Sequence, residues 1–158
     1  MTTSITPLGG DYSTNAYFLV EIQGVELGVF RELSGLQVTV ETVPIPEGGQ
    51  NGYVRKVPGR MDWPNLVLKR GLTDSDVMLD WLNKSSGQGF AAQNNKLART
   101  TVSITAMDSS GNRLRAWNVV DAFPVRWKGP DFSVDGRDTL QEELEITHNG
   151  FTAETDPQ

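Results

Sequence analysis

The sequence contains no cysteine and a single histidine among its 158 residues. Without cysteine the chain forms no disulfide, no thiolate metal site and no cysteine nucleophile. One histidine cannot supply the two imidazoles of a two-histidine zinc site within one chain. These absences exclude several classes of enzyme and metalloprotein and leave the function itself open.

Basic side chains are outnumbered, with 14 Lys and Arg against 20 Asp and Glu and a net charge of −6. Nucleic acids and anionic membranes attract basic surfaces, so this balance argues against either as a binding partner.

Long apolar runs are also missing. The longest strongly apolar stretch is Tyr17–Val20, whereas a spanning helix needs about 20 residues. The N-terminus lacks the basic start and apolar run of a secretory signal, and we expect no stable membrane insertion.

Short alternating segments separated by glycine and proline predict a mainly β fold, a small antiparallel barrel or sandwich. In Tyr17–Gln23, for example, Phe18, Val20 and Ile22 share one face, and Val25–Phe30 follows Gly24 as the second strand of a hairpin. The other predicted strands are Leu36–Val43, with Leu36, Val38 and Val40 on one face, Thr101–Met107, and Arg113–Val120, which follows a turn at Asp108–Asn112.

Thr139–His148 allows two interpretations. Leu140 and Leu144 lie at helical spacing, but together with Ile146 they also fit the period of a strand. The turn signal Asn149-Gly150 and the β-branched Ile146 favour the strand.

One helix is expected after Thr73. Thr73 to Asp76 loosely fit a capping box, and Gly87 is a plausible stop. Two apolar pairs four residues apart follow the cap and predict that the helix lies against the sheet: Val77 with Trp81, and Met78 with Leu82.

Val43–Asp62 is crowded with proline and glycine and predicts one long extended loop, in which only Tyr53–Val57 has the pattern of an extended segment. A loop of this length is uncommon in a compact domain unless it has a function. The segment contains no residue set with evident chemistry, so its length indicates a contact with a partner.

Candidate catalytic groups each have a simpler structural explanation. His148 has no marked nucleophile beside it, and Glu142 would point away from Glu143 and Glu145 on a strand, which does not suit a carboxylate pair. Gly48–Gly52 lacks the Lys-Ser/Thr ending of a phosphate-binding loop. We therefore predict no catalytic, metal-binding or cofactor-binding residue. The four tryptophans, at positions 63, 81, 117 and 127, leave open a carbohydrate platform or ordinary packing.

The order and spacing of several short patterns resemble the tail tube protein family of contractile phages and phage-derived contractile injection systems. That family is similar in fold to the haemolysin-coregulated (Hcp) tube of type VI secretion. The resemblance covers about residues 14 to 151. The patterns that carry it are Phe18–Gly24, Gly28–Leu36, Glu41, Gly48-Gly49, Asn51, Val57–Arg60, Leu66–Gly71, Trp81, Trp117, Ala122–Pro130 and Glu142–Gly150.

The resemblance implies one Hcp-like β-barrel domain over residues 1–158, with flexible ends at about 1–13 and 152–158. Protomers would form hexameric rings that stack into a hollow tube, driven through a target envelope by sheath contraction. The implied partners are other copies of the chain, the sheath, the baseplate or spike hub, tube-terminating proteins, and cargo effectors or DNA in the lumen. We expect synthesis in the bacterial cytoplasm, assembly into a phage tail-like particle, and no enzymatic activity.

Two residue sets are predicted to serve this role. The ring-stacking, inter-protomer set is Glu47, Gly48, Gly49, Asn51, Tyr53 and Arg55, and the lumen-facing set is Gln37, Thr39, Glu41, Glu143 and Glu145. The alternative function is a monomeric β-sandwich module that binds a carbohydrate or a protein ligand.

Overall fold

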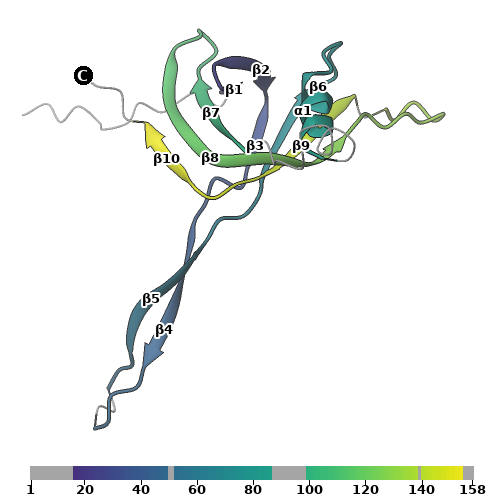
Figure 1. The fold of residues 1–158 in the computed structure, drawn as a ribbon. Coiled ribbons are helices and arrows are strands. Elements are labelled where there is room, and N and C mark those ends of the chain that lie inside the picture. The colour runs from purple at the N-terminus through teal and green to yellow at the C-terminus, as the bar shows by residue number, and fades with distance from the viewer. Residues whose placement is uncertain (1–15, 50–51, 87–98, 139, 155–158) are drawn as a thin grey trace, which may run out of the picture.

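A computed structural model of the chain describes residues 16–49, 52–86, 99–138 and 140–154. The predicted flexible end at 1–13 and the helix stop at Gly87 lie outside these ranges. The described residues form ten strands and one helix (Figure 1). They are β1 (Tyr17–Ile22), β2 (Val25–Phe30), β3 (Glu32–Ser34), β4 (Thr39–Ile45), β5 (Arg55–Asp62), β6 (Leu66–Gly71), α1 (Val77–Ser85), β7 (Thr100–Met107), β8 (Arg113–Lys128), β9 (Gln141–Thr147) and β10 (Phe151–Glu154).

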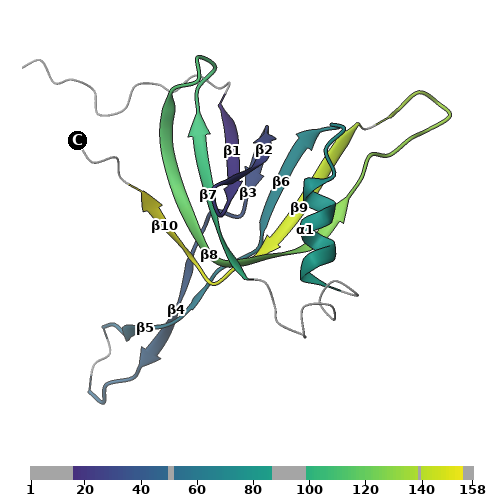
Figure 2. The same cartoon turned by 45° about the horizontal axis from the view of Figure 1, so that its top comes forward.

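Eight strands form one antiparallel sheet in the order β2-β1-β7-β8-β9-β6-β3, with β10 paired to β8. The 16-residue β8 joins its two layers: the part up to Ala122 pairs with β7 and β10, and the part from Phe123 pairs with β9. Asp121 lies at the junction with a φ of 51°. The sheet therefore folds over at β8 (Figure 2). Within the described chain its end strands, β2 and β3, do not pair, so the fold is an open sandwich and not a closed barrel.

The core lies between the two layers. Inward-facing side chains of alternating strand residues are fully buried, among them Val20, Phe30, Leu68, Ile104 and Leu144. The strand interpretation of Thr139–His148 is confirmed, because β9 buries Leu144 and Ile146 and turns Glu143 and Glu145 outward. The β1–β2 hairpin is confirmed as well.

The predicted turn at Asp108–Asn112 joins β7 to β8. Asp108 Oδ1 accepts the backbone N–H groups of Ser110 and Asn112, both at 2.9 Å, and Oδ2 accepts the Asn112 side-chain amide at 3.0 Å. These hydrogen bonds, with the Asn112 side chain contributing most, lower the pKa of Asp108. The carboxylate thus stabilises the turn in its ionised form.

The predicted helix is confirmed, but its capping box is not. Helix α1 begins after Asp76, whose side chain makes no cap hydrogen bond, and Thr73 Oγ1 instead accepts the Ser75 N–H at 3.3 Å in a local turn. Met78 and Trp81 are buried in the core, and Val77 is 41% exposed. Each of the two apolar pairs therefore contributes one residue to the core: Trp81 from the first pair and Met78 from the second.

Two expectations for residues 36–62 are wrong. Val43–Asp62 is not an extended loop but most of a hairpin, because β4 and β5 pair along their lengths. The expected core strand Leu36–Val43 is displaced to Thr39–Ile45, and Val40 is 43% exposed. Alternation indicates a buried face only when another layer covers the strand. The described chain supplies no such layer here.

We predict that Trp81→Ala lowers the free energy of unfolding by roughly 3–5 kcal/mol, because the indole fills the space between α1 and the sheet. Urea unfolding followed by circular dichroism measures this change. Val77→Ala on the exposed side of the same helix is the control and should be nearly neutral. Equal losses in the two variants would contradict this assignment of the buried face.

Candidate functional site: a projecting arm and open strand edges

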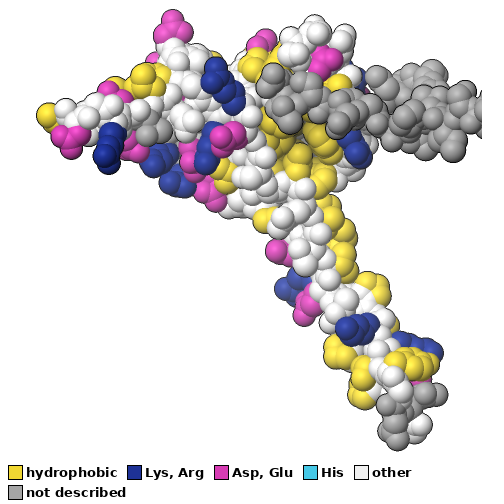
Figure 3. Space-filling model, turned by 180° about the vertical axis from the view of Figure 1, so that it is seen from behind, with side chains coloured by type: hydrophobic (Ala, Val, Ile, Leu, Met, Phe, Trp, Pro, Cys, Tyr) yellow, Lys and Arg dark blue, Asp and Glu magenta, His cyan; other side chains and the backbone are white. Residues whose placement is uncertain are grey.

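The β4–β5 hairpin and its connection, Thr39–Asp62, form an arm that projects from the sandwich (Figures 1 and 2). Among the described strands, β4 and β5 pair only with each other. Hydrophobic side chains lie along the arm in Figure 3. Exposures between 41% and 56% are found for Val40, Val43, Ile45, Val54 and Met61. Apolar side chains gathered on a protruding element mark an interaction surface.

The predicted ring-stacking residues lie near the free end of this arm. Glu47 Oε1 and Arg55 Nη1 form an ion pair at 3.3 Å, and Tyr53 is 59% exposed. Gly48 and Gly49 are also exposed, and Asn51 lies outside the described residues. The hairpin brings the described members together, while their role in stacking stays a prediction.

The root of the arm is held by an aromatic cluster. The centroid of the Trp63 ring lies 5.1 Å from that of the Phe151 ring and 6.3 Å from that of the His148 ring, and both contacts are edge-on. His148 is buried; its Nε2 lies 3.0 Å from the Pro64 carbonyl oxygen, and its Nδ1 accepts the Gly150 N–H at 3.0 Å. These partners fit a neutral imidazole protonated at Nε2. His148 is therefore a structural residue that fixes the arm to the β9–β10 turn.

The predicted lumen-facing residues lie on two different parts of the chain. Gln37, Thr39 and Glu41 are exposed at the root of the arm. Glu143 and Glu145 lie on the outer face of β9, where Arg126 Nη1 is 3.2 Å from Glu143 Oε1 and 3.7 Å from Glu145 Oε2. Their position relative to a lumen remains a prediction.

The sandwich also has open strand edges. β2, β3 and β10 each pair on one side only within the described chain. Val25 and Val29 on β2 are 66% and 45% exposed. An unpaired edge presents backbone N–H and C=O groups that another strand can pair with. The sandwich therefore offers sites for strand pairing between molecules.

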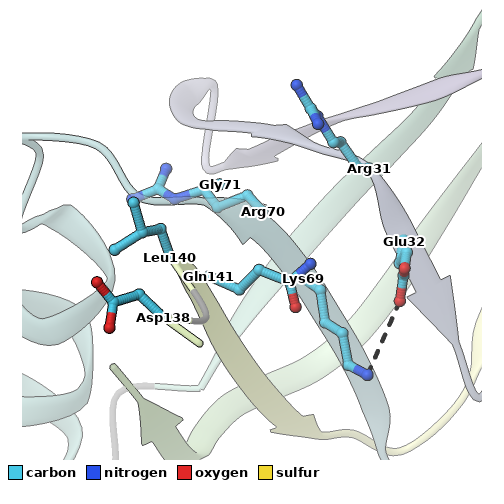
Figure 4. A pocket seen from close by; sticks show the side chains of 8 residues that line it. All are labelled: Arg31, Glu32, Lys69, Arg70, Gly71, Asp138, Leu140 and Gln141. Atoms are coloured by element: carbon cyan, nitrogen blue, oxygen red, sulfur yellow. Dashed lines mark ion pairs between the residues drawn. The ribbon is translucent and has the colours of Figure 1, made fainter. Parts of the chain in front are cut away.

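A depression of about 440 Å³ is lined by Arg31, Glu32, Lys69, Arg70, Gly71, Asp138, Leu140 and Gln141 (Figure 4). Lys69 Nζ lies 3.8 Å from Glu32 Oε2. Arg70 is 4% exposed and its Nε lies 2.9 Å from Oε2 of buried Glu142. Charged side chains of both signs therefore line the depression.

Arg70 connects four parts of the fold. Besides Glu142 on β9, its guanidinium donates to the backbone carbonyls of Leu27 on β2, at 3.2 Å, and of Ser75 before α1, at 3.4 Å, and it lies 5.4 Å from the centre of the Phe30 ring. Sequence reasoning missed this pair. The signal was present, because Glu142 shares the buried face of Leu144 and Ile146, and Arg70 shares that of Leu66 and Leu68.

The tryptophans do not form a carbohydrate platform. Trp81 is buried, Trp117 and Trp127 pack against the core, and Trp63 belongs to the cluster at the root of the arm.

Among the described residues, no group of three or more His, Cys, Asp or Glu side chains is arranged to hold a metal ion. The described helix is too short to cross a membrane.

We predict that Arg70→Met lowers the free energy of unfolding by about 3–5 kcal/mol, because it leaves the Glu142 carboxylate buried without its partner. The double variant Arg70→Met/Glu142→Leu should recover most of that loss, since neither charge then remains. Urea unfolding of both variants and of Glu142→Leu completes a double-mutant cycle. A strictly additive double variant would contradict the coupling.

Comparisons with known proteins agree with this description. The family model of the T4-like virus tail tube protein gp19 matches residues 14–152. A chain of the PVC sheath-tube complex, from an extracellular contractile injection system, superposes with a TM-score of 0.75 at 22% identity, covering 98% of each chain. A chain of the anti-feeding prophage tube-terminating cap gives 0.72 at 23% identity, covering 98% of this chain and 99% of that one.

An Hcp protein in a crystal structure gives a TM-score of 0.50 at 16% identity, covering 88% of this chain and 91% of that one, so the Hcp-like fold is shared. A search of curated protein sequences finds no match. The family model spans nearly the whole chain, including the arm and the open-edged β2 and β3. The chain belongs to the T4-like tail tube protein family and is a structural tube subunit.

Proposed function

We propose that the protein builds the inner tube of a contractile injection system or phage tail, in which six copies close into a ring and the rings stack into a hollow tube. The arm is the observation that carries this proposal, because its apolar side chains are left exposed by the single chain. The family match names the kind of assembly, a tail tube, in which we expect these side chains to be covered.

Ring closure uses the open edges of the sandwich. When the edge strands of neighbouring copies pair, their sheets join into one larger closed surface that leaves no unpaired edge. The same contact repeated around an axis closes a cyclic ring. Six copies are supported by a similar chain, with a TM-score of 0.68 at 20% identity, in the six-fold symmetrised baseplate of the anti-feeding prophage.

The partners follow from the places where similar chains are found, namely a sheath-tube complex, a sheath/tube terminator and a baseplate. We propose that sheath contraction drives this tube through a target envelope, and that its lumen carries effectors or DNA. Assembly begins in the bacterial cytoplasm. The function is mechanical and uses no catalytic residue.

The test is the assembly state of the purified full chain, measured by size-exclusion chromatography and negative-stain electron microscopy. Rings or tubes are expected. Small particles at every concentration would contradict the proposal and favour the monomeric binding module. We expect tubes to be longer when the cognate sheath is coexpressed, since the sheath surrounds and stabilises them.

Deletion of Glu47–Gly52 tests the contribution of the free end of the arm. The shortened protein should keep its circular dichroism spectrum and form rings, because every strand of the sandwich and of the arm is retained, but it should not stack. Electron microscopy distinguishes single rings from tubes. Normal stacking of the deletion variant would exclude this part of the arm from the contact.

Thr39→Cys tests the lumen assignment at a position where no native thiol interferes. In assembled tubes this cysteine should react poorly with a bulky maleimide, because the lumen restricts access, and it should react fully after disassembly. The matched control is a cysteine at Ser109, an exposed position in the β7–β8 turn. Rapid, complete labelling of Thr39→Cys in intact tubes would remove this residue from the lumen.

A further inference from the structure

The connection between β8 and β9 is a second projection of the molecule. Figures 1 and 2 show it leaving the sandwich in a different direction from the arm. Every residue from Asp131 to Asp138 is exposed, and we call this segment the β8–β9 loop. The arm and the β8–β9 loop of one chain thus point to different neighbours.

Two large hydrophobic side chains of the β8–β9 loop lie in water. Phe132 is 72% exposed and Val134 is fully exposed, more than any other large hydrophobic residue that the structure describes. Apolar side chains gathered on a projecting element gain free energy when a partner covers them. The loop therefore has the character of a contact surface.

Hydrogen bonds fix the shape of the β8–β9 loop. Asp138 Oδ1 accepts the Ser133 N–H at 2.7 Å, and the Ser133 carbonyl oxygen accepts the Gly136 N–H at 3.2 Å. At the base of the connection the Leu140 carbonyl oxygen accepts the Leu72 N–H at 3.0 Å. A loop that is ordered in advance loses less conformational entropy when it binds.

The β8–β9 loop and β5 of the arm carry opposite charge. Three aspartates and one arginine give Asp131–Asp138 a net charge of −2, whereas two arginines, one lysine and one aspartate give Arg55–Asp62 a net charge of +2. Asp135 in the loop and Lys56 in β5 are exposed and have no ion-pair partner among the described residues. Because the whole chain has a net charge of −6, the basic β5 is the exception to which an acidic loop is complementary.

Lys56 shares one face of the arm with apolar side chains. Val40 pairs with Met61, Thr42 with Pro58 and Pro44 with Lys56, and alternation along β4 puts these pairs on one side, which we call the contact face. Val40 is 43% and Met61 is 50% exposed. The contact face thus combines apolar side chains with a positive charge, as the β8–β9 loop combines them with a negative charge.

We propose that the β8–β9 loop receives the arm of another copy of the chain, with Phe132 and Val134 against the contact face and Asp135 beside Lys56. This inference rests on the proposed tube. The contact joins two different surfaces of identical chains, so it repeats from one copy to the next. It links neighbouring rings, while the edges of the sandwich close each ring.

Photocrosslinking identifies the segment that meets the loop. A chain with p-benzoylphenylalanine in place of Phe132 is coassembled with an excess of ¹⁵N-labelled wild-type chain, and the crosslinked peptides are sequenced by mass spectrometry. The loop should be joined to residues 40–61 of a ¹⁵N-labelled neighbour. The matched control has p-benzoylphenylalanine in place of Val77, on the exposed side of α1, and should give no crosslink to the arm.

Charge reversal tests whether Asp135 and Lys56 are paired. Asp135→Lys and Lys56→Glu should each leave rings but abolish tubes, because each places like charges together at every contact between rings. The double variant should form tubes again, since the pair is restored with its signs exchanged. Asp74→Lys makes the same change of charge at an exposed position before α1, and it should stack as the wild type does. Electron microscopy measures tube length in all four variants.

The outcomes separate this contact from the proposed tube. If wild-type tubes form but the label at Phe132 gives no crosslink to the arm, or joins the sheath protein instead in particles assembled with the sheath, the contact is wrong and the tube stands. Normal stacking of both single variants, or no recovery in the double variant, contradicts the contact as well. If wild-type chain forms neither rings nor tubes, the tube itself is wrong and the contact with it.

Discussion

The arm has two faces, and none of the described residues forms a layer over either of them; this constraint governs the rest of the molecule. Within the part of the chain that the structure describes, β4 is paired with β5 alone. An isolated two-stranded ribbon is marginally stable in water, because it buries too little apolar surface to offset the ordering of its residues. Assembly can supply the missing surfaces. The conformation of the arm and the formation of the tube are therefore linked.

The orientation of a projecting element must also be fixed, since a small rotation at its root becomes a large displacement at its end. Buried polar contacts provide this rigidity. His148 uses both ring nitrogens to hold Pro64 and Gly150, and Arg70 ties β2, β6 and β9 together with the segment before α1. Buried polar groups are costly when they lose a partner, so alternative arrangements of the root are disfavoured.

The sequence predicts best where another layer covers a strand. In β1, β7 and β9 the apolar alternation marks the buried face correctly, because one side packs on the core. The same reasoning fails in β4, over which no part of the described chain forms a second layer. Proline and glycine suggested a loop between Val43 and Asp62, yet Pro44, Pro58 and Gly59 lie within the two paired strands. The residue types alone do not show that Pro44 and Pro58 stand at positions where strand pairing needs no backbone N–H.

The positions of the prolines indicate that the arm and the sandwich contact other molecules in different ways. Each strand of the arm contains a proline, Pro44 in β4 and Pro58 in β5, at positions two residues apart in register. A proline is compatible with a ribbon where its missing N–H would point to the outer edge. Such an edge is a poor template for a further strand. The open-edged β2, β3 and β10 contain no proline. The sandwich is thus suited to pairing through its edges, and the arm to docking through its faces.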